Sequence, residues 1–275
     1  MIENCGGQHG TASVNAGKRI GSPPHKERMR KMYLDKCFPR EIAEAKKNNT
    51  PVVIVGGTVE YHGPQCSYGC DTLVAQGLVE KLAERKDIII APSISYSPSS
   101  YAVGDATSGT VHVEENAFEE YVYYVFMSML SSGLRNIYVV IHHQFEQENL
   151  MPMTLSYMKA AKRATMAYLE KTKGQGWWGS ESYKDYYDNL GQEDDPFSWI
   201  KVIPAMSKEA QNATGYDHAG KYECSILMAL YPDAVKLERL GDIDHWFTKS
   251  SAEANKELGE EMVRLSLEAL EKRIV

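Results

Sequence analysis

The sequence predicts an α/β protein with three layers, in which a mostly parallel sheet is flanked by helices. Short runs rich in Val and Ile, typical of buried strands, alternate with longer segments whose apolar residues recur at helical spacing. The strand-like runs are residues 50–57, 87–96 and 136–143, and the helix-like segments are residues 71–86, 114–134 and 150–173. This alternation is typical of a parallel sheet with helices on its faces.

Each element has its own local signal. "TPVVIVGG" (50–57) is β-branched and ends in glycines, and "DIIIAPSISY" (87–96) and "NIYVVIHH" (136–143) are similar apolar runs. The segment after the first run has Leu73, Val74, Leu78, Val79 and Leu82 on one helical face. The next predicted helix, residues 114–134, stops at a glycine.

The second half of the chain departs from this alternation. Residues 174–200 are dense in Trp, Tyr, Gly and acidic residues and show no clean period. We expect this aromatic-rich insertion to be either a surface excursion against a neighbouring subunit or a lid over a small ligand. Residues 218–233 predict a last core segment, and residues 252–275 predict a terminal amphipathic helix. Without repeats or a second boundary, residues 1–275 are expected to form a single domain.

Composition narrows the class of protein. Hydrophobic residues make up 43% and charged residues 24%, which are ordinary globular values. The net charge of −7 argues against a nucleic-acid partner, and no apolar run of about 18 residues predicts a membrane span. The five cysteines lack regular spacing and the polar N-terminal arm (1–25) lacks a signal-peptide pattern, so we expect a reducing, cytoplasmic location.

The stretch "VGGTVEYHGPQCSYGCD" (55–71) concentrates residues that suit chemistry. A phosphate loop is a poor interpretation, because the glycine order is wrong and Glu60 would repel a phosphate. Cys66 and Cys70 have a C-x-x-x-C spacing without a second pair, which favours incidental thiols over a zinc site.

A metal site suits the same stretch better. Glu60 and His62 are two apart in extended backbone, so their side chains point the same way. Asp71 stands at the predicted start of a helix, where it can act as a cap or turn inward as a ligand. Carboxylates and imidazole suit Zn, Mn or Fe. The structural alternative is a capping aspartate, a surface glutamate and a hydrogen-bonded histidine.

Two further clusters follow later strands. "IHHQFEQEN" places His142, His143, Glu146 and Glu148 after a predicted strand. Since consecutive residues leaving a strand alternate in direction, at most one of these histidines is expected to face the site. The third cluster has Asp217, His218 and Glu223 in "TGYDHAGKYECS". Its Asp-His pair suits proton transfer, and its glutamate suits either a metal or the support of a histidine.

In combination these motifs resemble the creatininase (creatinine amidohydrolase) family. "GGTVEYHGPQ…D" is similar to the family's G-x-x-E-x-H-G-P-H…D signature, and "TSGTV" (107–111) resembles its P-G-T segment. "SSGLRNIYVVIHH" resembles the lead into its N-G-H motif, and "DHAGKYECSILMALYP" resembles its H-A-G-x-x-E-T-S block. The resemblance covers roughly residues 40 to 235 and implies a creatininase-like α/β fold.

The resemblance implies one or two divalent ions (Zn, Mn or Fe) per chain. By position, Glu60, Asp71 and His143 would hold the first ion. His62 and Asp71 would hold the second, with Asp71 bridging. A further glutamate would complete the second set; Glu148 is the first choice, and Glu146 and Glu223 are the other candidates.

The resemblance also implies an activity. His218 would be the acid/base beside Asp217, and the enzyme would be a metal-dependent hydrolase that opens a small cyclic amide or related cyclic carbonyl compound. A homo-oligomer, often a hexamer, is implied as well. Gln65 replaces the histidine after Gly-Pro and "CSYGC" replaces the usual L-P-L-x-T, so creatinine itself is not assumed as the substrate.

Three alternatives remain open from the sequence. The first is a C–C hydrolase of a cyclic diketone from sugar or inositol breakdown, which would use the same electrophilic activation. The second is a non-catalytic α/β protein whose polar clusters bind only the hydroxyls of a small molecule. The third is a structural subunit with a decayed site.

Overall fold

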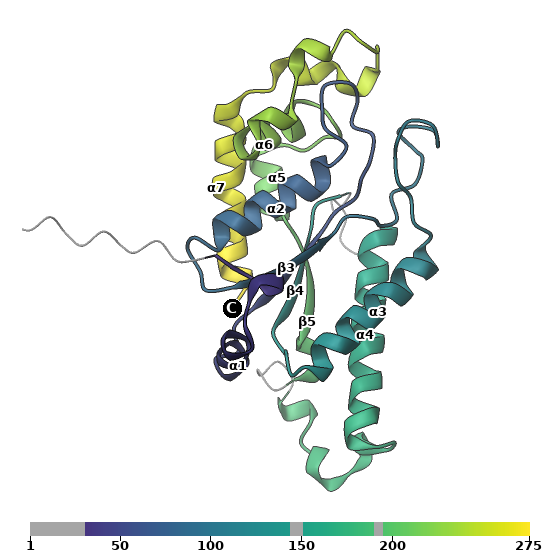
Figure 1. The fold of residues 1–275 in the computed structure, drawn as a ribbon, viewed down its shortest axis with the longest axis vertical. Helices are drawn as coiled ribbons and strands as arrows, with labels where there is room; N and C mark the ends of the chain where they lie inside the picture. The colour runs from purple at the N-terminus through teal and green to yellow at the C-terminus, as the bar shows by residue number, and fades with distance from the viewer. Residues whose placement is uncertain (1–30, 144–150, 190–194) are drawn as a thin grey trace, which may run out of the picture.

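A computed structural model of the chain describes residues 31–143, 151–189 and 195–275 (Figure 1). Five parallel strands form one sheet in the order β1-β3-β2-β4-β5. The strands are β1 (Met32–Tyr33), β2 (Val52–Gly56), β3 (Ile89–Ile94), β4 (Ile137–Ile141) and β5 (Ile200–Pro204). The predicted parallel sheet is confirmed, and β2 is its central strand.

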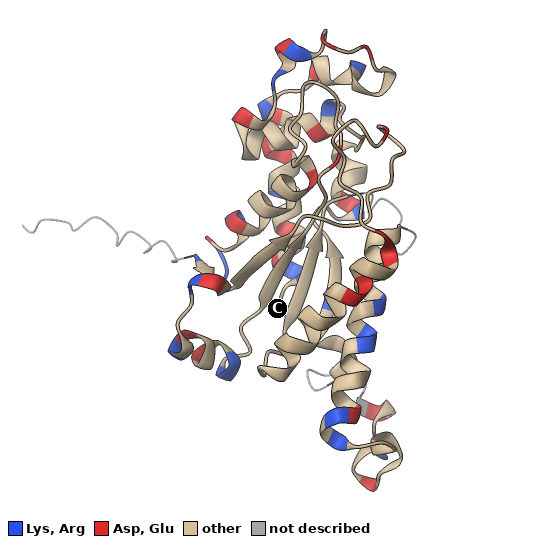
Figure 2. Ribbon diagram, turned by 45° about the vertical axis from the view of Figure 1, so that its right-hand side comes forward, with Lys and Arg blue, Asp and Glu red and all other residues tan. Residues whose placement is uncertain are grey.

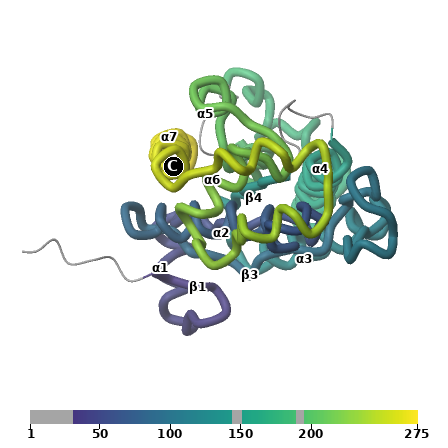
Figure 3. Tube along the Cα trace, turned by 90° about the horizontal axis from the view of Figure 1, so that it is seen from above, coloured from purple at the N-terminus to yellow at the C-terminus, as the bar shows by residue number. Residues whose placement is uncertain are grey.

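Helices cover both faces of this sheet. They are α1 (Pro39–Lys47), α2 (Cys70–Leu82), α3 (Glu115–Ser131), α4 (Pro152–Lys173), α5 (Lys208–Thr214), α6 (Lys221–Leu230) and α7 (Lys256–Arg273). Alternate residues of β2 serve the two layers: Val53 and Val55 pack with α2, α6 and α7, and Val52 and Ile54 pack with α3 and α4. Seen from above, α7 lies across the molecule from α3 and α4 (Figure 3).

Several elements escaped the sequence prediction. They are β1, α1, β5, α5 and the 3-10 segment η8 (Trp246–Glu253). The apolar run of β5 follows directly on the irregular insertion, so its strand signal is short and lacks a clear start. The six predicted strands and helices of the first half, and the terminal helix, are all present with ends shifted by a few residues.

The described parts of the aromatic insertion form short 3-10 turns. These are η2 (Trp177–Gly179), η3 (Glu181–Tyr183), η4 (Tyr187–Asn189) and η5 (Pro196–Ser198). They lead from the end of α4 into the start of β5, and they lie beyond the amino ends of the strands, at the lower end of Figure 1. The predicted site residues lie at the carboxyl ends, so the lid interpretation is wrong for the chain's own site.

The topology creates one point where neighbouring loops diverge. After β2 the chain turns to α2 on one face, and after the adjacent β4 it turns to α4 on the other face. Ligands in open α/β sheets bind in the crevice at such a point, outside the carboxyl ends of the strands. The stretches 57–71 and 142–143 both emerge there.

Charged residues of both signs are spread over the helices (Figure 2). Acidic residues of α3 lie beside basic residues of α4, where Glu119 contacts Lys159 and Arg163. None of the helices in the described ranges is long and apolar enough to span a membrane.

Candidate metal centre

The loop after β2 brings Glu60 and the start of α2 together. A side chain at Gly57 would place its Cβ 2.6 Å from the backbone nitrogen and Cα of Thr72, so only glycine lets α2 begin this close to the strand end. Asp71, in the first turn of α2, is thereby held beside Glu60. The local chain geometry therefore joins two carboxylates that are eleven residues apart.

One group of ligand-type atoms consists of Glu60, Asp71 and His143. Nδ1 of His143 lies 3.3 Å from Oε2 of Glu60 and 3.4 Å from Oδ2 of Asp71. All three side chains are buried, and one ligand atom from each lies within 4.8 Å of the others. This is the set that the family resemblance implies for the first ion.

A second group surrounds the other oxygen of Asp71. Nε2 of His62 lies 3.7 Å from Oδ1 of Asp71 and 3.4 Å from Oε2 of Glu223, which comes from the first turn of α6. His142 joins the same group, with its Nε2 3.1 Å from Oε1 of Glu223. The two oxygens of Asp71 thus face two different imidazoles.

Both histidines after β4 reach the cluster, so the expectation that at most one faces the site is wrong. The strand ends at Ile141, and His142 and His143 no longer follow the alternation of a strand. His142 turns to Glu223, and His143 turns to Glu60 and Asp71.

The cluster leaves polar atoms that no hydrogen bond satisfies. Both carboxylate oxygens of Glu60, Oδ2 of Asp71 and Nε2 of His62 are buried and make no contact with hydrogen-bond geometry. Apart from Oε1 of Glu60, these atoms have only the longer contacts of 3.3–3.7 Å within the cluster. His62 Nδ1 lies 3.0 Å from the carbonyl oxygen of Glu60 and donates to it, so in the neutral ring the lone pair of Nε2 faces the cluster. Because unsatisfied buried polar groups are costly, and these atoms are the types that bind Zn, Mn or Fe, the residues fit a divalent ion.

Glu223 differs from these residues. Its Oε2 accepts a hydrogen bond from the backbone N–H of Ala219 at 2.6 Å, and its Oε1 contacts His142. Both oxygens are therefore engaged by the protein itself. Of the other glutamates considered for the second ion, Glu146 and Glu148 lie outside the described residues, as does the N-terminal arm.

Without an ion the cluster consists of imidazolium–carboxylate pairs. Burial would lower the pKa of His143, but the adjacent Asp71 and Glu60 carboxylates raise it to about 10. Burial also opposes protonation of His62, and Glu223 and Asp71 outweigh it, so its pKa is raised well above the usual value. Burial acts in the opposite direction on Asp71, yet His62 and His143 hold the pKa of this carboxyl below its ordinary range.

The predicted acid/base pair lies next to the cluster but is not joined as expected. The ring of His218 lies against that of His62, with centroids 4.3 Å apart, and its Nε2 is 3.3 Å from the carbonyl oxygen of Tyr61. Asp217 instead accepts hydrogen bonds from the backbone N–H groups of Tyr222 and Glu223 at the start of α6. Asp217 therefore holds the helix that carries Glu223.

Three cysteines pack behind the cluster. Cys66, Cys70 and Cys224 are buried and form no disulfide, and the sulfur atoms of Cys66 and Cys224 lie 3.1 Å apart. Burial and neighbouring groups raise the pKa of the Cys70 and Cys224 thiols. A raised pKa makes a thiol a poor nucleophile. The sulfur of Cys70 also lies within 4.8 Å of ligand atoms of His62 and Glu223, so this thiol borders the second group.

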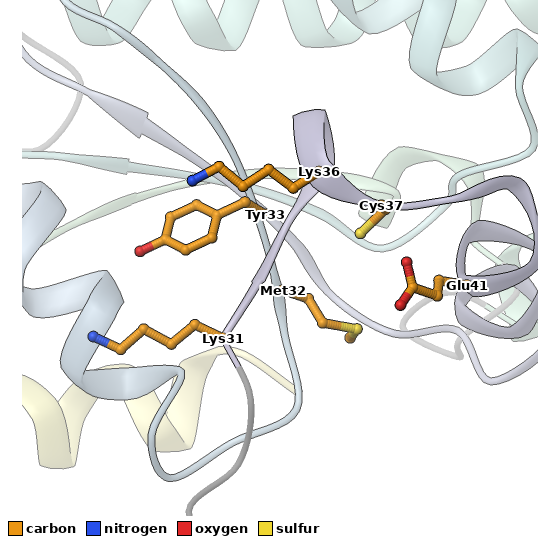
Figure 4. A pocket seen from close by; sticks show the side chains of 6 residues that line it. All are labelled: Lys31, Met32, Tyr33, Lys36, Cys37 and Glu41. Carbon is orange, nitrogen blue, oxygen red and sulfur yellow. The ribbon is translucent and has the colours of Figure 1, made fainter.

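A separate hollow of about 240 Å³ lies beside β1. Its lining residues are Lys31, Met32, Tyr33, Lys36, Cys37 and Glu41 (Figure 4). Because β1 pairs with the first residues of β3, this hollow lies near the amino ends of the strands. It is therefore not part of the candidate metal centre.

Sequence reasoning missed a segment of the site. His245 and Phe247 lie beside Tyr61 and His218, although they come from the region after the last predicted core segment. The signal was the local sequence "DHWF", which combines an imidazole with two large aromatic rings.

The fold and the cluster together define an α/β protein with a candidate metal centre at the switch point of its sheet. Residues 36–266 match the family model described as "Creatininase: Creatinine amidohydrolase". The chain belongs to the creatininase family, as the sequence motifs indicated.

Two curated relatives carry different activities in their names. The chain is 28% identical over 130 residues to the "3-dehydro-scyllo-inosose hydrolase" of Thermotoga maritima, an alignment of 47% of this chain and 40% of the relative. It is 24% identical over 192 residues to the "Creatinine amidohydrolase" of Pseudomonas putida, covering 69% of this chain and 66% of the relative. The matches thus span less than two thirds of either relative.

Solved structures support the fold. A creatininase structure named "Creatininase Mn" aligns with a TM-score of 0.65 and 16% identity over 89% of this chain and 99% of that chain. A mutant creatininase complexed with creatine aligns with the same TM-score and identity, over 89% and 98% of the two chains. The creatininase-like three-layer architecture is therefore confirmed.

The raised pKa of His143 has a consequence for the metal-free protein. A folded-state pKa of about 10, against 6.5 for the free side chain, means that stabilisation by the proton is complete below pH 6.5 and is lost as pH rises through 10. In chelator, the free energy of unfolding should therefore fall between pH 7 and pH 9, by at most about 1.4 kcal/mol per pH unit for this proton, and the melting temperature should fall with it. Differential scanning fluorimetry in chelator at several pH values measures this melting temperature.

Added zinc should counteract this loss of stability with rising pH. Zinc competes with protons for the same imidazoles, so its stabilising effect should grow over the same pH range. His143→Gln serves as the control and should reduce the pH dependence in chelator, leaving the part that His62 contributes. A melting temperature that stays constant from pH 7 to pH 9 in the metal-free wild type would contradict the pairing.

Proposed function

We propose that this chain is a metal-dependent hydrolase that opens a small cyclic amide or a related cyclic carbonyl compound. The observation that carries the proposal is the buried Asp71 carboxylate, whose two oxygens face His62 and His143, with unsatisfied ligand atoms on either side. Membership of the creatininase family supports the same reaction class.

The residues suggest a two-ion centre. Glu60, Asp71 and His143 would hold one ion, and His62 and Asp71 would contribute to the other, for which Glu148 stays the predicted third ligand. Zn, Mn or Fe ions at such a centre would supply an activated water and polarise a substrate carbonyl.

Glu223 supports this arrangement from outside. Its contacts with His62, His142 and the N–H of Ala219 favour a role in orienting the imidazoles over direct coordination.

His218 would protonate the leaving group as the substrate ring opens. Its half-buried ring lies against His62, so it borders the candidate centre and remains open to solvent. The carbonyl of Tyr61 accepts from its Nε2 and orients the imidazole. Asp217 would act indirectly, since its carboxylate anchors the first turn of α6.

The substrate class rests on the relatives and on the altered loop. Curated relatives are named for hydrolysis of creatinine and of 3-dehydro-scyllo-inosose, so C–N and C–C bond cleavage are both supported by similarity. Gln65, which replaces the family's histidine, donates a hydrogen bond to the carbonyl of Ala219 at 2.7 Å. Gln65 thus joins the loop after β2 that carries Glu60 and His62 (the metal loop) to the turn that carries His218. This difference from the family pattern argues against assigning creatinine as the substrate.

We further propose a cytoplasmic homo-oligomer, with a hexamer implied by the resemblance. Trp178 and Tyr187 of the insertion are 47% and 68% exposed, which suits contact with another subunit. Light scattering of the purified protein is expected to give a molar mass six times the 30.9 kDa of one chain. A monomer at micromolar concentration would contradict this assembly.

Activity should depend on Asp71. The zinc- or manganese-loaded protein is expected to hydrolyse creatinine or 3-dehydro-scyllo-inosose. The rate is measured by chromatography of the ring-opened product. Asp71→Asn should lower kcat/KM by more than about 100-fold, since even loss of supporting contacts around a metal costs 10–100-fold. The control is Asp87→Asn, an exposed aspartate at the amino end of β3, which should leave activity unchanged. No hydrolysis of either compound, or equal activity in both variants, would contradict the proposal.

A further inference from the structure

A short C-terminal segment, residues 245–248, packs directly on the metal loop. A side chain at Gly63, which has φ +75°, would place its Cβ 2.5 Å from the methyl carbon of Thr248. Thr248 is buried and its hydroxyl donates to the carbonyl oxygen of His245. The glycine therefore lets this segment approach the loop that carries Glu60 and His62, and fixes where His245 lies.

Tyr61 connects the loop to this segment. It stands between Glu60 and His62 in the chain, and its ring contacts His245 edge-on at 5.6 Å. The hydroxyl of Tyr61 lies 3.0 Å from Nε2 of His245, within hydrogen-bond distance. One polar pair is thus built from two segments that are 184 positions apart.

A row of rings continues from this pair to the candidate centre. His245 stacks on Phe247 with centroids 4.9 Å apart and an angle of 19°. Phe247 lies 5.7 Å from His218, which in turn lies 4.3 Å from His62. The segment therefore borders the side of the cluster on which the predicted acid/base stands.

This side is also where a small molecule has access. Glu60, His62 and Asp71 are only 1–2% exposed, whereas His218, His245 and Phe247 are half-buried. Trp246, between the latter two, is 83% exposed and is the most exposed large hydrophobic side chain in the described ranges. Residues 245–247 therefore border the half-buried face of His218.

We propose that Tyr61 and His245 are substrate-binding residues that hydrogen-bond oxygen substituents of a hydroxylated cyclic ketone, with Phe247 packing against the ring. This inference rests on the proposed hydrolase function and narrows its substrate class. A phenol and an imidazole can each donate and accept a hydrogen bond, which matches hydroxyl groups. An aromatic face next to such a pair suits a compact ring with one apolar face. Creatinine offers this pair one carbonyl oxygen and N–H groups, whereas a polyhydroxylated ring offers several neighbouring groups that each donate and accept.

The first experiment separates binding from turnover. Tyr61→Phe and His245→Gln are each expected to raise KM for 3-dehydro-scyllo-inosose by about 3- to 10-fold with kcat unchanged, the effect of one lost hydrogen bond. Both should change KM for creatinine less than KM for 3-dehydro-scyllo-inosose in an enzyme that accepts both. Tyr168→Phe is the matched control, because Tyr168 lies on α4, away from the site, and the change removes a hydroxyl that accepts a hydrogen bond from Arg135. KM values equal to this control would overturn the inference while leaving the hydrolase function intact.

A second measurement does not depend on activity. The other three tryptophans, Trp177, Trp178 and Trp199, lie near the amino ends of the strands, so a fluorescence change at the site reports Trp246. Scyllo-inosose, which has the hydroxylated ring but lacks the second ketone, should give a saturable change in the zinc-loaded protein. Trp246→Phe should abolish the signal, and Tyr61→Phe should weaken the affinity about 3- to 10-fold.

The outcomes of the two measurements are distinguishable. Absence of a saturable signal in the wild type, or an affinity unchanged in Tyr61→Phe, would overturn the inference. A protein that binds scyllo-inosose in this way but hydrolyses neither substrate would retain the binding site and refute the hydrolase function. Tyr61→Phe keeps the buried ring, so it carries the test even where His245→Gln fails to fold.

Discussion

The site is organised by one buried carboxylate shared between two imidazoles. Asp71 is 2% exposed, and its two oxygens face His62 and His143 at 3.7 and 3.4 Å. A buried charge of this kind is tolerated only when it is paired or bound to a metal. The surrounding structure satisfies that condition: Gly57 brings the first turn of α2 to the end of β2, and the adjacent β4 supplies His143. Changes that move α2 relative to these strands would therefore disturb both halves of the centre.

A second layer of contacts joins distant parts of the chain around this carboxylate. Asp217 holds the first turn of α6, and α6 presents Glu223 to His62 and His142. Gln65 links the metal loop to the turn after His218. Because these contacts come from the segments after β2, β4 and β5, the centre requires these three strands and α6 to be assembled together. The partly exposed His218 then marks the side open to substrate.

Much of this arrangement was predictable from residue patterns, and the failures have physical causes. Strand and helix periodicity located β2, α2, β3, α3, β4 and α4, because each buries a regular apolar face. The order of these elements placed Glu60, Asp71 and His143 at neighbouring strand ends. The lid interpretation of residues 174–200 failed because periodicity does not show at which end of a sheet a connection lies. The expectation for His142 failed because the alternation rule ends with the strand, at Ile141. The sequence "DHWF" indicates a polar aromatic segment at His245, but its contact with Tyr61 depends on a close packing at Gly63 that the local sequence does not show.

The most direct measurement of the shared carboxylate is the metal content of matched variants after dialysis against zinc, by plasma mass spectrometry. We expect two zinc ions per chain in the wild type. His62→Gln and His143→Gln should each lose one ion, and Asp71→Asn should lose both. Folding of each variant is checked by circular dichroism, so that a lost ion is not a lost fold. A folded Asp71→Asn that keeps the wild-type metal content would contradict the central role of Asp71.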